Sequence, residues 1–273
     1  MALPVTYLFV PGHRPERFDK AAQAGADAVI LDLEDAVEPS LKDEARAAVR
    51  AWLSTRADGP PALVRINDAT SPWFAADLEV LSQTGAWGAV LPKAENPAQV
   101  DMLARALPNE GLILPLIESA RGLKAVDAIA SAQKVQRLVF GTLDFAVDLE
   151  LSGDERGLTP AALALSVASR CAGLAAPVAG VTTALDDNDA LVNDVAWARA
   201  VGFTAKLCIH PRQVEAVRRQ LGPSEDELAW ARRVLSAAQT SGGTFQVDGR
   251  MVDRPVLLKA QSILDRASPD RTN

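Results

Sequence analysis

Two carboxylates in the sequence stand where metal chemistry is possible. Glu118 ends the apolar run LILPLIE, and Asp144 follows the apolar run RLVFG. Carboxylate oxygens, with waters completing an octahedron, are the ligands that Mg²⁺ prefers. The pair therefore predicts a magnesium site. The alternative is that Glu118 caps a helix starting at Ser119 and that Asp144 caps the next helix, and spacing alone does not choose between the two.

Arg65 lies inside the short apolar run LVRI, where a guanidinium without a partner is costly. It needs a carboxylate, either one from a substrate bound bidentately or an internal one from Glu34 or Asp35. Lys93, in LPKAE, is expected to pair with Glu95 or another acid of the same rim. Because Lys93 lies on a polar rim rather than in an apolar pocket, a Schiff-base role is disfavoured.

A cluster of acids ends another apolar run. The stretch VILDLEDAVE (29–38) places Asp32, Glu34 and Asp35 after a segment typical of a buried strand. Packed charge is costly unless it is paired or bound to something. These acids are either solvated loop residues or the rim of a site that needs negative charge.

The histidines and cysteines do not form a zinc-binding pattern. His13 and His210 are each expected to be structural rather than catalytic bases. Cys171 and Cys208 are far apart, without CxxC spacing, and we expect two buried free thiols in a reducing compartment. Any metal site must then be built from oxygen, which favours Mg²⁺.

Eight short apolar runs alternate with longer, Ala-rich amphipathic segments. This alternation predicts a parallel sheet whose strands are buried on both faces. Eight strands are what a (β/α)8 TIM barrel requires, and a doubly wound open sheet is the alternative. In a barrel, the polar residues that end the strands meet at one mouth. The expected strands are 6–10, 28–33, 63–66, 88–92, 112–118, 137–141, 176–180 and 205–210.

Two helices carry local start or stop signals. Gly25 is placed to end the helix of ERFDKAAQAG. The helix of SLKDEARAAVRAWLS begins with Ser40 as its expected cap, followed by early acids.

The last fifty residues differ from the barrel pattern, so we expect a barrel over residues 1–222 and an extension over 223–273. A helix is predicted over 224–239. Gly242 and Gly243, followed by TFQVDG, predict a hairpin or flap. A final helix begins at about Pro255. We expect this extension to act as a lid that packs on the barrel or on a neighbouring subunit.

Composition excludes some classes of partner. The 273 residues are 48% hydrophobic and 23% charged, a balance typical of a globular protein with a large core. The net charge of −7 and pI near 5.0 give no broad basic face for nucleic acid. The N-terminal MALPVTYLFVPG lacks a basic segment, and its apolar run is too short for a signal peptide or membrane span. We expect a cytoplasmic protein with no nucleic-acid or membrane partner.

Seven motifs, in order, resemble the citrate lyase β-subunit-like family of the HpcH/HpaI aldolase/citrate lyase superfamily, acyl-CoA lyase type. They extend from about Thr6 to about Ala267. The resemblance implies a (β/α)8 barrel with a C-terminal lid, Mg²⁺ as cofactor, and homotrimers or hexamers. The motifs are YLFVPGHRPERFDKA, ADAVILDLEDAVEPSLKDEAR, LVRIN, VLPKAE, LIESARG, LCIHPRQV and GRMVDRPVL.

The resemblance also implies roles for the candidate residues. Glu118 and Asp144 carry over as the metal ligands, and Arg65 as the clamp on the carboxylate of a 2-oxo acid. In acyl-CoA lyases of this family, an Asp in the MVD lid segment acts in catalysis at a neighbouring subunit's site, and here that residue is Asp253. Arg14, with Arg17 and Lys20 nearby, is expected to contact the CoA phosphates.

The same resemblance assigns a supporting role to the acids at the end of the expected strand 28–33. Asp32, Glu34 and Asp35 would order metal-bound waters and pair with cations such as Arg65 or Lys93. One departure from the family pattern is Glu150, in GTLDFAVDLELSG, where the family often has Gly. This difference bears on loop shape and substrate fit more than on metal binding.

The implied function is a Mg²⁺-dependent carbon–carbon lyase, of the oxo-acid-lyase type. It would cleave a 3-hydroxyacyl-CoA such as citramalyl-, malyl- or citryl-CoA into acetyl-CoA and a 2-oxo acid, or form it from these two compounds. Three alternatives stay open: a β subunit of a citrate lyase complex acting on an acyl-carrier-protein thioester, a CoA-independent 2-oxo acid aldolase, and a malyl-CoA thioesterase.

Overall fold

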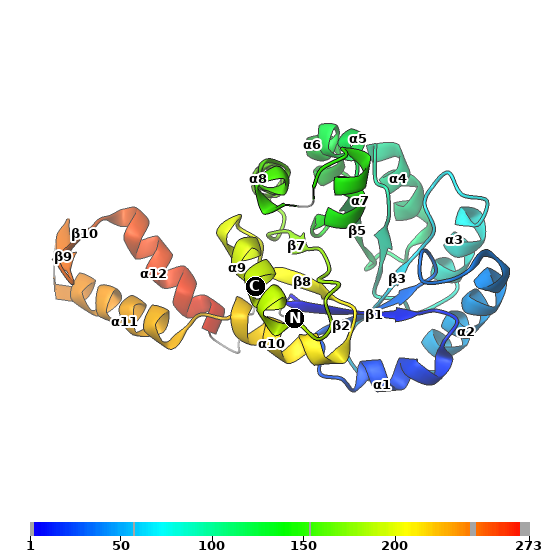
Figure 1. Cartoon of the computed structure of the whole chain (residues 1–273), viewed down its shortest axis with the longest axis horizontal. Helices are drawn as coiled ribbons and strands as arrows, with labels where there is room; N and C mark the ends of the chain where they lie inside the picture. Colours follow the sequence, from blue (N-terminus) through cyan, green and yellow to red (C-terminus); the bar gives the residue numbers. More distant parts are fainter. Residues whose placement is uncertain (1–2, 57, 153, 241–243, 268–273) are drawn as a thin grey trace. The chain divides into compact units, whose positions relative to one another are not determined.

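The structure is a computed structural model that describes residues 3–56, 58–152, 154–240 and 244–267 (Figure 1). The chain divides into two compact units, one formed by Pro4–Val217 and the other by Leu3 with the described residues from Arg218 onward. The sequence places a boundary slightly later, after residue 222, and the role of the second unit as a lid stays a prediction. Within the described residues, no helix is long and apolar enough to cross a membrane.

Eight parallel strands form a closed barrel, in sequence order from β1 to β8. Strand β1 pairs with β2 on one side and with β8 on the other, which closes the sheet. The predicted TIM barrel is therefore confirmed, and the open-sheet alternative is wrong. The strands are β1 Thr6–Pro11, β2 Ala28–Asp32, β3 Ala62–Arg65, β4 Gly88–Leu91, β5 Leu112–Ile117, β6 Val139–Phe140, β7 Val178–Ala179 and β8 Ala205–Cys208.

Burial on both faces explains why the strands lack polar alternation. Every residue of β2, β4 and β5 is buried, because one face fills the barrel interior and the other meets the helices. The barrel interior is packed with Tyr7 of β1 and aliphatic side chains from the other seven strands. Strands β6 and β7 have two residues each, shorter than the runs that the sequence predicted.

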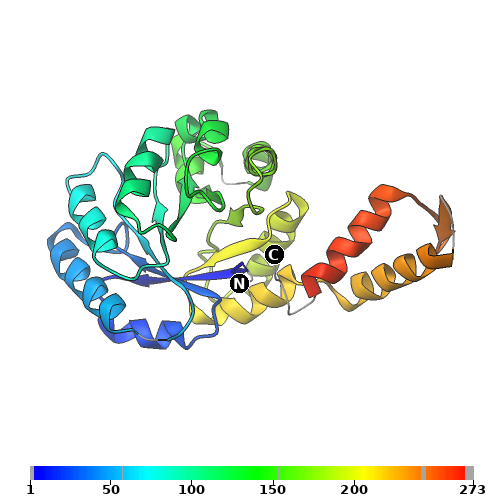
Figure 2. The same ribbon diagram turned by 180° about the vertical axis from the view of Figure 1, so that it is seen from behind.

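The helices of the first unit surround the barrel, as Figures 1 and 2 show from opposite sides. They are η1 Pro15–Arg17, α1 Phe18–Ala22, η2 Pro39–Leu41, α2 Lys42–Thr55, α3 Phe74–Ser82, α4 Pro97–Ala106, α5 Ala120–Lys124, α6 Val126–Ala130, α7 Thr142–Asp148, α8 Glu155–Cys171, α9 Asn188–Ala200 and α10 Pro211–Leu221, the last of which extends past the division after Val217.

Two expected helix signals act differently in the structure. Helix α1 ends at Ala22, before Gly25, although Gly25 does adopt the left-handed φ of +81°. Ser40 does not cap α2: it lies in the short helix η2, and α2 follows Leu41 without a side-chain cap. The preceding turn continues directly into the helix, so no polar cap is required there.

The second unit is a helical hairpin joined by two short strands. It contains α11 Glu225–Thr240, β9 Phe245–Val247, β10 Arg250–Val252 and α12 Arg254–Ala267. The strands pair antiparallel around Asp248 and Gly249, which both have positive φ, as a two-residue hairpin turn requires. The predicted hairpin is present, but its turn is Asp248–Gly249, and Gly242 and Gly243 lie outside the described residues.

Neither cysteine forms a disulfide within the described residues, and only one of them matches the expected burial. Cys208 ends β8 inside the barrel wall, whereas Cys171 ends α8 in an exposed position. The expectation of two buried thiols is therefore wrong for Cys171. Apolar neighbours in the sequence of an amphipathic helix do not reveal which side of the helix a residue occupies.

Candidate functional site

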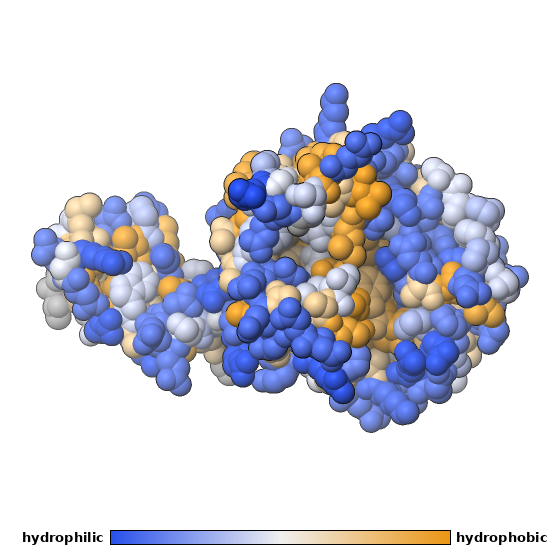
Figure 3. Space-filling model, in the orientation of Figure 1, coloured by the Kyte–Doolittle hydropathy of each residue, from blue (hydrophilic) through white to orange (hydrophobic). Residues whose placement is uncertain are grey.

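The predicted residues meet in a cavity of about 240 Å³ at the carboxyl ends of the strands. Asp32, Asp35, Arg65, Glu118 and Asp144 all line it. We call it the mouth cavity. Its remaining wall is mostly apolar, and Figure 3 shows hydrophobic surface gathered around a hollow of the barrel unit. The apolar lining comes from Phe9, Leu116, Leu143, Val181, Leu207 and Ile209.

Glu118 follows β5 and is 5% exposed. Its Oε1 accepts a hydrogen bond from the backbone N–H of Lys93 at 2.7 Å. Among the described residues, no lysine or arginine forms an ion pair with it. Burial therefore raises the pKa of Glu118 to about 8, against the Lys93 hydrogen bond, and the neighbouring Asp144 raises it further.

The backbone around Glu118 is shaped to hold its carboxylate. Lys93 has a φ of +47°, in the left-handed region that side-chain-bearing residues rarely adopt, and this turn directs its N–H at Glu118. From the other side, Gly141 packs so closely that a Cβ there would lie 2.5 Å from Glu118 Oε2 and 2.6 Å from its Cβ. The carboxylate is therefore confined between the two segments.

Asp144 lies in the first turn of α7 and is exposed to the mouth cavity. It does not cap the helix, because α7 follows Gly141 without a side-chain cap. Glu118 is no cap either: the hydroxyl of Ser119 caps α5 by accepting the N–H of Gly122 at 3.1 Å. The helix-cap alternative for the two acids is thus wrong, and both carboxylates remain available to a ligand.

Arg65 is held by internal acids, chiefly by Asp32. Its Nε and one terminal nitrogen donate to the two oxygens of Asp32 at 2.7 and 2.6 Å. Its other terminal nitrogen lies 3.0 Å from Glu34 and 3.8 Å from Asp35. From the residues alone, the sequence offered Glu34 or Asp35 as the internal partner, and the family resemblance added Asp32. Strand register makes Asp32 the main partner, since Asp32 and Arg65 are opposite each other in the β2–β3 ladder.

These charges compensate one another. Burial opposes the charged form of Arg65, yet the attraction of Asp32 and Glu34 outweighs it and raises the pKa of Arg65. Lys93 Nζ lies 3.0 Å from the second oxygen of Glu34, so Lys93 pairs with Glu34 and not with Glu95. The chain Asp32–Arg65–Glu34–Lys93, which we call the paired network, is therefore neutral in sum.

The donor set suits a hard cation. No group of three or more His, Cys, Asp or Glu gathers as a metal cage in the part of the chain that the structure describes. Two carboxylates with open space in front match Mg²⁺, which keeps several waters, better than Zn²⁺, which takes four N or S ligands. A cation between Glu118 and Asp144 would also relieve the uncompensated charge that raises the pKa of Glu118.

Arg14 and His210 do not line the mouth cavity, and Asp253 is not part of the barrel unit. Arg14 stands before η1, where its Nε donates to Glu16 at 2.9 Å. Asp253 belongs to the second unit, where its carboxylate accepts the N–H of Val256 at the start of α12. His210 precedes α10 and accepts the N–H of Arg212. The roles of Arg14 and Asp253 stay predictions.

One polar strand-end residue proves to be structural. Asn67, after β3, is 2% exposed, donates to Asp77 and accepts from Lys42 Nζ at 2.7 Å. Sequence reasoning missed the apolar half of the cavity. Leucine and valine at strand ends give no chemical signal, and only closure of the barrel brings them together.

Comparison with known proteins agrees with this geometry. A family model described as HpcH/HpaI aldolase/citrate lyase matches residues 6–211, and a carbon–carbon bond lyase model of the TIM-barrel fold matches residues 165–269. The chain belongs to the HpcH/HpaI aldolase/citrate lyase family. It is accordingly an enzyme of the carbon–carbon lyase class.

Three relatives cover nearly the whole chain. A citrate lyase subunit beta-like protein of Mycobacterium tuberculosis is 41% identical, over 96% of this chain and 94% of its own. A (3S)-malyl-CoA thioesterase of Cereibacter sphaeroides is 33% identical, over 95% of this chain and 93% of its own. The crystal structure of CitE from M. tuberculosis with magnesium, acetoacetate and coenzyme A has a TM-score of 0.87 and 38% identity, over 97% of this chain and 98% of that chain.

Proposed function

We propose that this protein is a Mg²⁺-dependent lyase that cleaves, or in reverse forms, a 3-hydroxyacyl-CoA such as citramalyl-, malyl- or citryl-CoA. The products of cleavage are acetyl-CoA and a 2-oxo acid. The observation that carries the proposal is Glu118, buried beside Asp144 without a cation partner among the described residues, in a cavity that also presents Arg65. A crystallised relative binds magnesium, acetoacetate and coenzyme A together.

Glu118 and Asp144 would hold the metal. Bound there, Mg²⁺ supplies positive charge that stabilises a developing oxyanion. Arg65 has five N–H groups, and Asp32 accepts two of them. Glu34 contributes an ion pair at 3.0 Å, so N–H groups remain that would donate to a substrate carboxylate. Because the paired network already fixes the guanidinium, it orients that carboxylate without losing freedom on binding.

The bond chemistry needs a proton donor and acceptor. In cleavage, the 3-hydroxyl loses its proton, the carbon–carbon bond breaks, and its electron pair forms the enolate of acetyl-CoA. That enolate then takes a proton at carbon. We propose Asp253 as the group that gives this proton, and that removes it in the condensing direction. We further propose that it acts across a homotrimer or hexamer.

A thioesterase is the second candidate, because a relative of that activity aligns over 95% of this chain. A citrate lyase β subunit and a CoA-independent aldolase are the remaining ones. Each of these candidates predicts a different substrate or product. Hydrolysis releases free CoA without a 2-oxo acid, an aldolase turns over free hydroxy acids, and a complex subunit requires the acyl-carrier-protein thioester.

The test is a panel of citramalyl-, malyl- and citryl-CoA with and without Mg²⁺, with acetyl-CoA, free CoA and 2-oxo acid all quantified. We expect Mg²⁺-dependent formation of acetyl-CoA and 2-oxo acid in equal amounts. Free CoA alone would instead identify a thioesterase, and no turnover in either direction would exclude the lyase.

Asp253→Ala tests the proposed acid. We expect turnover to fall by about 100- to 10,000-fold, the usual contribution of a general acid–base group, with unchanged Mg²⁺ affinity. Asp265→Ala is the matched control, since Asp265 lies on α12, the helix that follows Asp253, and accepts a hydrogen bond from Gln261. Full activity of Asp253→Ala would remove Asp253 from the mechanism.

A further inference from the structure

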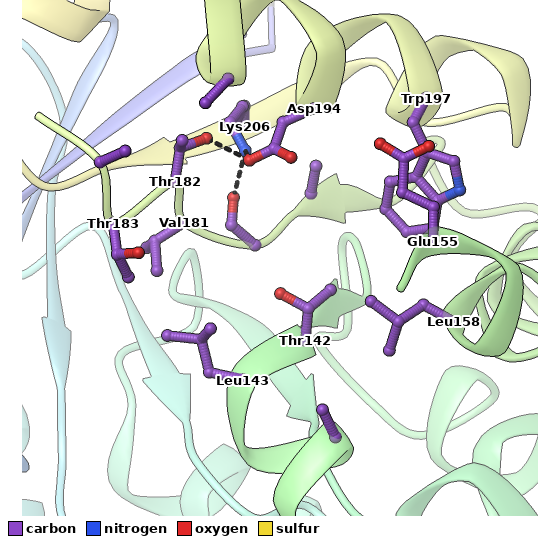
Figure 4. A pocket seen from close by; sticks show the side chains of 15 residues that line it. Thr142, Leu143, Glu155, Leu158, Val181, Thr182, Thr183, Asp194, Trp197 and Lys206 are labelled. Atoms are coloured by element: carbon purple, nitrogen blue, oxygen red, sulfur yellow. Dashed lines mark hydrogen bonds and ion pairs between the residues drawn. The ribbon is translucent and has the colours of Figure 1, made fainter. Parts of the chain in front are cut away.

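A second cavity, of about 310 Å³, lies beside the mouth cavity (Figure 4). We call it the side cavity. Its walls come from α7, α8, the segment that follows β7, α9 and β8. Voids left by imperfect packing are rarely larger than a water molecule, so a space of this size is a feature of the fold. It falls within the range of small-molecule sites.

The two cavities share a wall. Thr142, Leu143, Gly180 and Val181 line both of them. The first turn of α7 also carries Asp144, which lines the mouth cavity alone. A molecule held at Asp144 is therefore separated from the side cavity only by the start of α7 and the end of β7. Leu143, half exposed, stands at this boundary.

Most of the side cavity is apolar. Ala146, Leu158, Ala190 and Trp197 contribute to its walls. The indole N–H of Trp197 is already donated to Thr159 Oγ1 at 3.0 Å, so the ring offers the cavity no hydrogen-bond donor. These walls fit an aliphatic chain.

The polar part of the side cavity disfavours a second negative charge. Lys206 is 2% exposed and donates to the carbonyl of Gly180 at 2.8 Å, and Asp194 lies 3.8 Å from it (Figure 4). Burial lowers the pKa of Lys206, against the attraction of Asp194. Thr182 donates to the same Asp194 oxygen. Glu155, which is exposed, also lines the cavity, so its walls carry two carboxylates and one ammonium.

We propose that the side cavity receives the tail of the 2-oxo acid, so that the protein prefers 2-oxo acids with a neutral aliphatic chain longer than that of pyruvate. This inference rests on the proposed lyase function, because it places the carboxylate and oxo end of the acid at Arg65, Glu118 and Asp144. From there the tail passes Leu143 and Val181. A tail that ends in a carboxylate is disfavoured by Glu155 and Asp194.

The test measures condensation with acetyl-CoA in the presence of Mg²⁺. In this step the α-carbon of acetyl-CoA loses a proton, bonds to the oxo carbon, and the oxo oxygen gains a proton. Pyruvate, 2-oxobutanoate and 2-oxopentanoate form a series of increasing length. We expect kcat/KM to rise by about 10-fold or more per added methylene, the usual effect of filling an apolar pocket. 2-Oxoglutarate, with five carbons like 2-oxopentanoate but a terminal carboxylate, should react no better than pyruvate.

A variant that fills the side cavity tests whether the dependence on chain length arises there. Ala190→Phe adds a ring to the side cavity from α9, away from the helix that carries Asp144. It should abolish the gain with chain length. Ala200→Phe is the matched control, because Ala200 is exposed at the end of the same helix. A length series that is flat in the unmodified protein, or that Ala190→Phe leaves unaltered, overturns the inference.

Binding separates this inference from the proposed function. Calorimetric affinities of the same acids, with Mg²⁺ present, require no turnover. Suppose that no condensation or cleavage occurs, but affinity still rises with chain length and Ala190→Phe removes the rise. The lyase proposal then fails, whereas the inference that the side cavity binds the tail of the acid is supported. If pyruvate is turned over but neither affinity nor kcat/KM depends on length, the lyase stands and the side-cavity inference fails.

Discussion

The mouth cavity contains two groups of carboxylates with opposite surroundings. On the β2–β3 side, Asp32 and Glu34 are paired with Arg65 and Lys93 at 2.6 to 3.0 Å. On the β5–β6 side, Glu118 accepts a backbone N–H from Lys93 but forms no ion pair among the described residues, and the like charge of Asp144 acts on it more strongly than the attraction of Arg65. Both groups are acids that follow buried strands, and the sequence does not distinguish them.

This difference in ion pairing distinguishes the carboxylates that stabilise the fold from those that are available to bind a ligand. A buried carboxylate that already has a cation and several hydrogen bonds gains little from a metal ion. A buried carboxylate without a cationic partner has a raised pKa and favours its protonated form, and a bound cation would favour its ionised form. The paired network therefore holds Arg65 in place. The Glu118–Asp144 pair is the part of the cavity where a bound cation would be stabilising.

The largest effect is expected for Glu118→Gln. It should lower Mg²⁺ affinity by at least about 100-fold, because even residues that only support a metal ligand contribute 10- to 100-fold. Below about pH 4.5, where Glu118 is protonated in both the native and the unfolded chain, the free energy of unfolding should change by less than about 1 kcal/mol, because Gln matches the protonated form in shape. Calorimetric Mg²⁺ titration and urea unfolding measure the two quantities. Unaltered Mg²⁺ affinity would move the metal site elsewhere.

Asp32→Asn should show the reverse pattern. It leaves the buried Arg65 without its main partner, which we expect to lower the free energy of unfolding by about 3–5 kcal/mol. Asp35→Asn is the control, because Asp35 is largely exposed and 3.8 Å from Arg65, and should cost less than about 1 kcal/mol. Equal losses in the two variants, measured by urea unfolding, would contradict the distinction drawn between paired and unpaired acids.

The pH dependence of stability sharpens the same comparison. Burial raises the pKa of Glu118 from 4.5 to about 8, so between these values the metal-free native state binds a proton that the unfolded chain lacks. The contribution of Glu118 to the free energy of unfolding is therefore full below about pH 4.5 and is lost as pH rises to about 8. Subtracting the profile of Glu118→Gln isolates this contribution. A difference profile that is flat over this range, without metal, would argue against the raised pKa.

The smallest effect concerns Lys93, which touches both groups. Its ammonium is half exposed, so pairing with Glu34 should contribute less than about 1 kcal/mol. Lys93→Gly and Lys93→Ala both remove it, but only glycine accepts the φ of +47° without strain. We expect Lys93→Gly to be more stable than Lys93→Ala by about 1 kcal/mol. Equal stability in urea would show that the left-handed turn at Lys93 is not strained.

Much of the fold was predictable because its signals are local. Eight apolar runs lie within a few residues of the eight observed strands, since burial on both faces selects continuous apolar sequence. Barrel closure was predicted from strand number. The ends of β6 and β7 were not, because the flanking residues remain apolar after the ladder hydrogen bonds stop. Likewise, Gly25 and Ser40 had plausible cap roles that neighbouring turns made unnecessary.

By itself, the sequence determined which residues end the strands, and therefore that Asp32, Arg65, Glu118 and Asp144 share one mouth. Only the tertiary structure decided their partners. Register placed Asp32 opposite Arg65, whereas a left-handed turn at Lys93 and the close approach of Gly141 confine Glu118 at a position where no described lysine or arginine forms an ion pair with it. The side cavity likewise exists only where α7, α8 and α9 pack around β7 and β8. The physical reason is that strand formation depends on local burial patterns, whereas charge compensation depends on distances of a few ångströms between segments far apart in the chain.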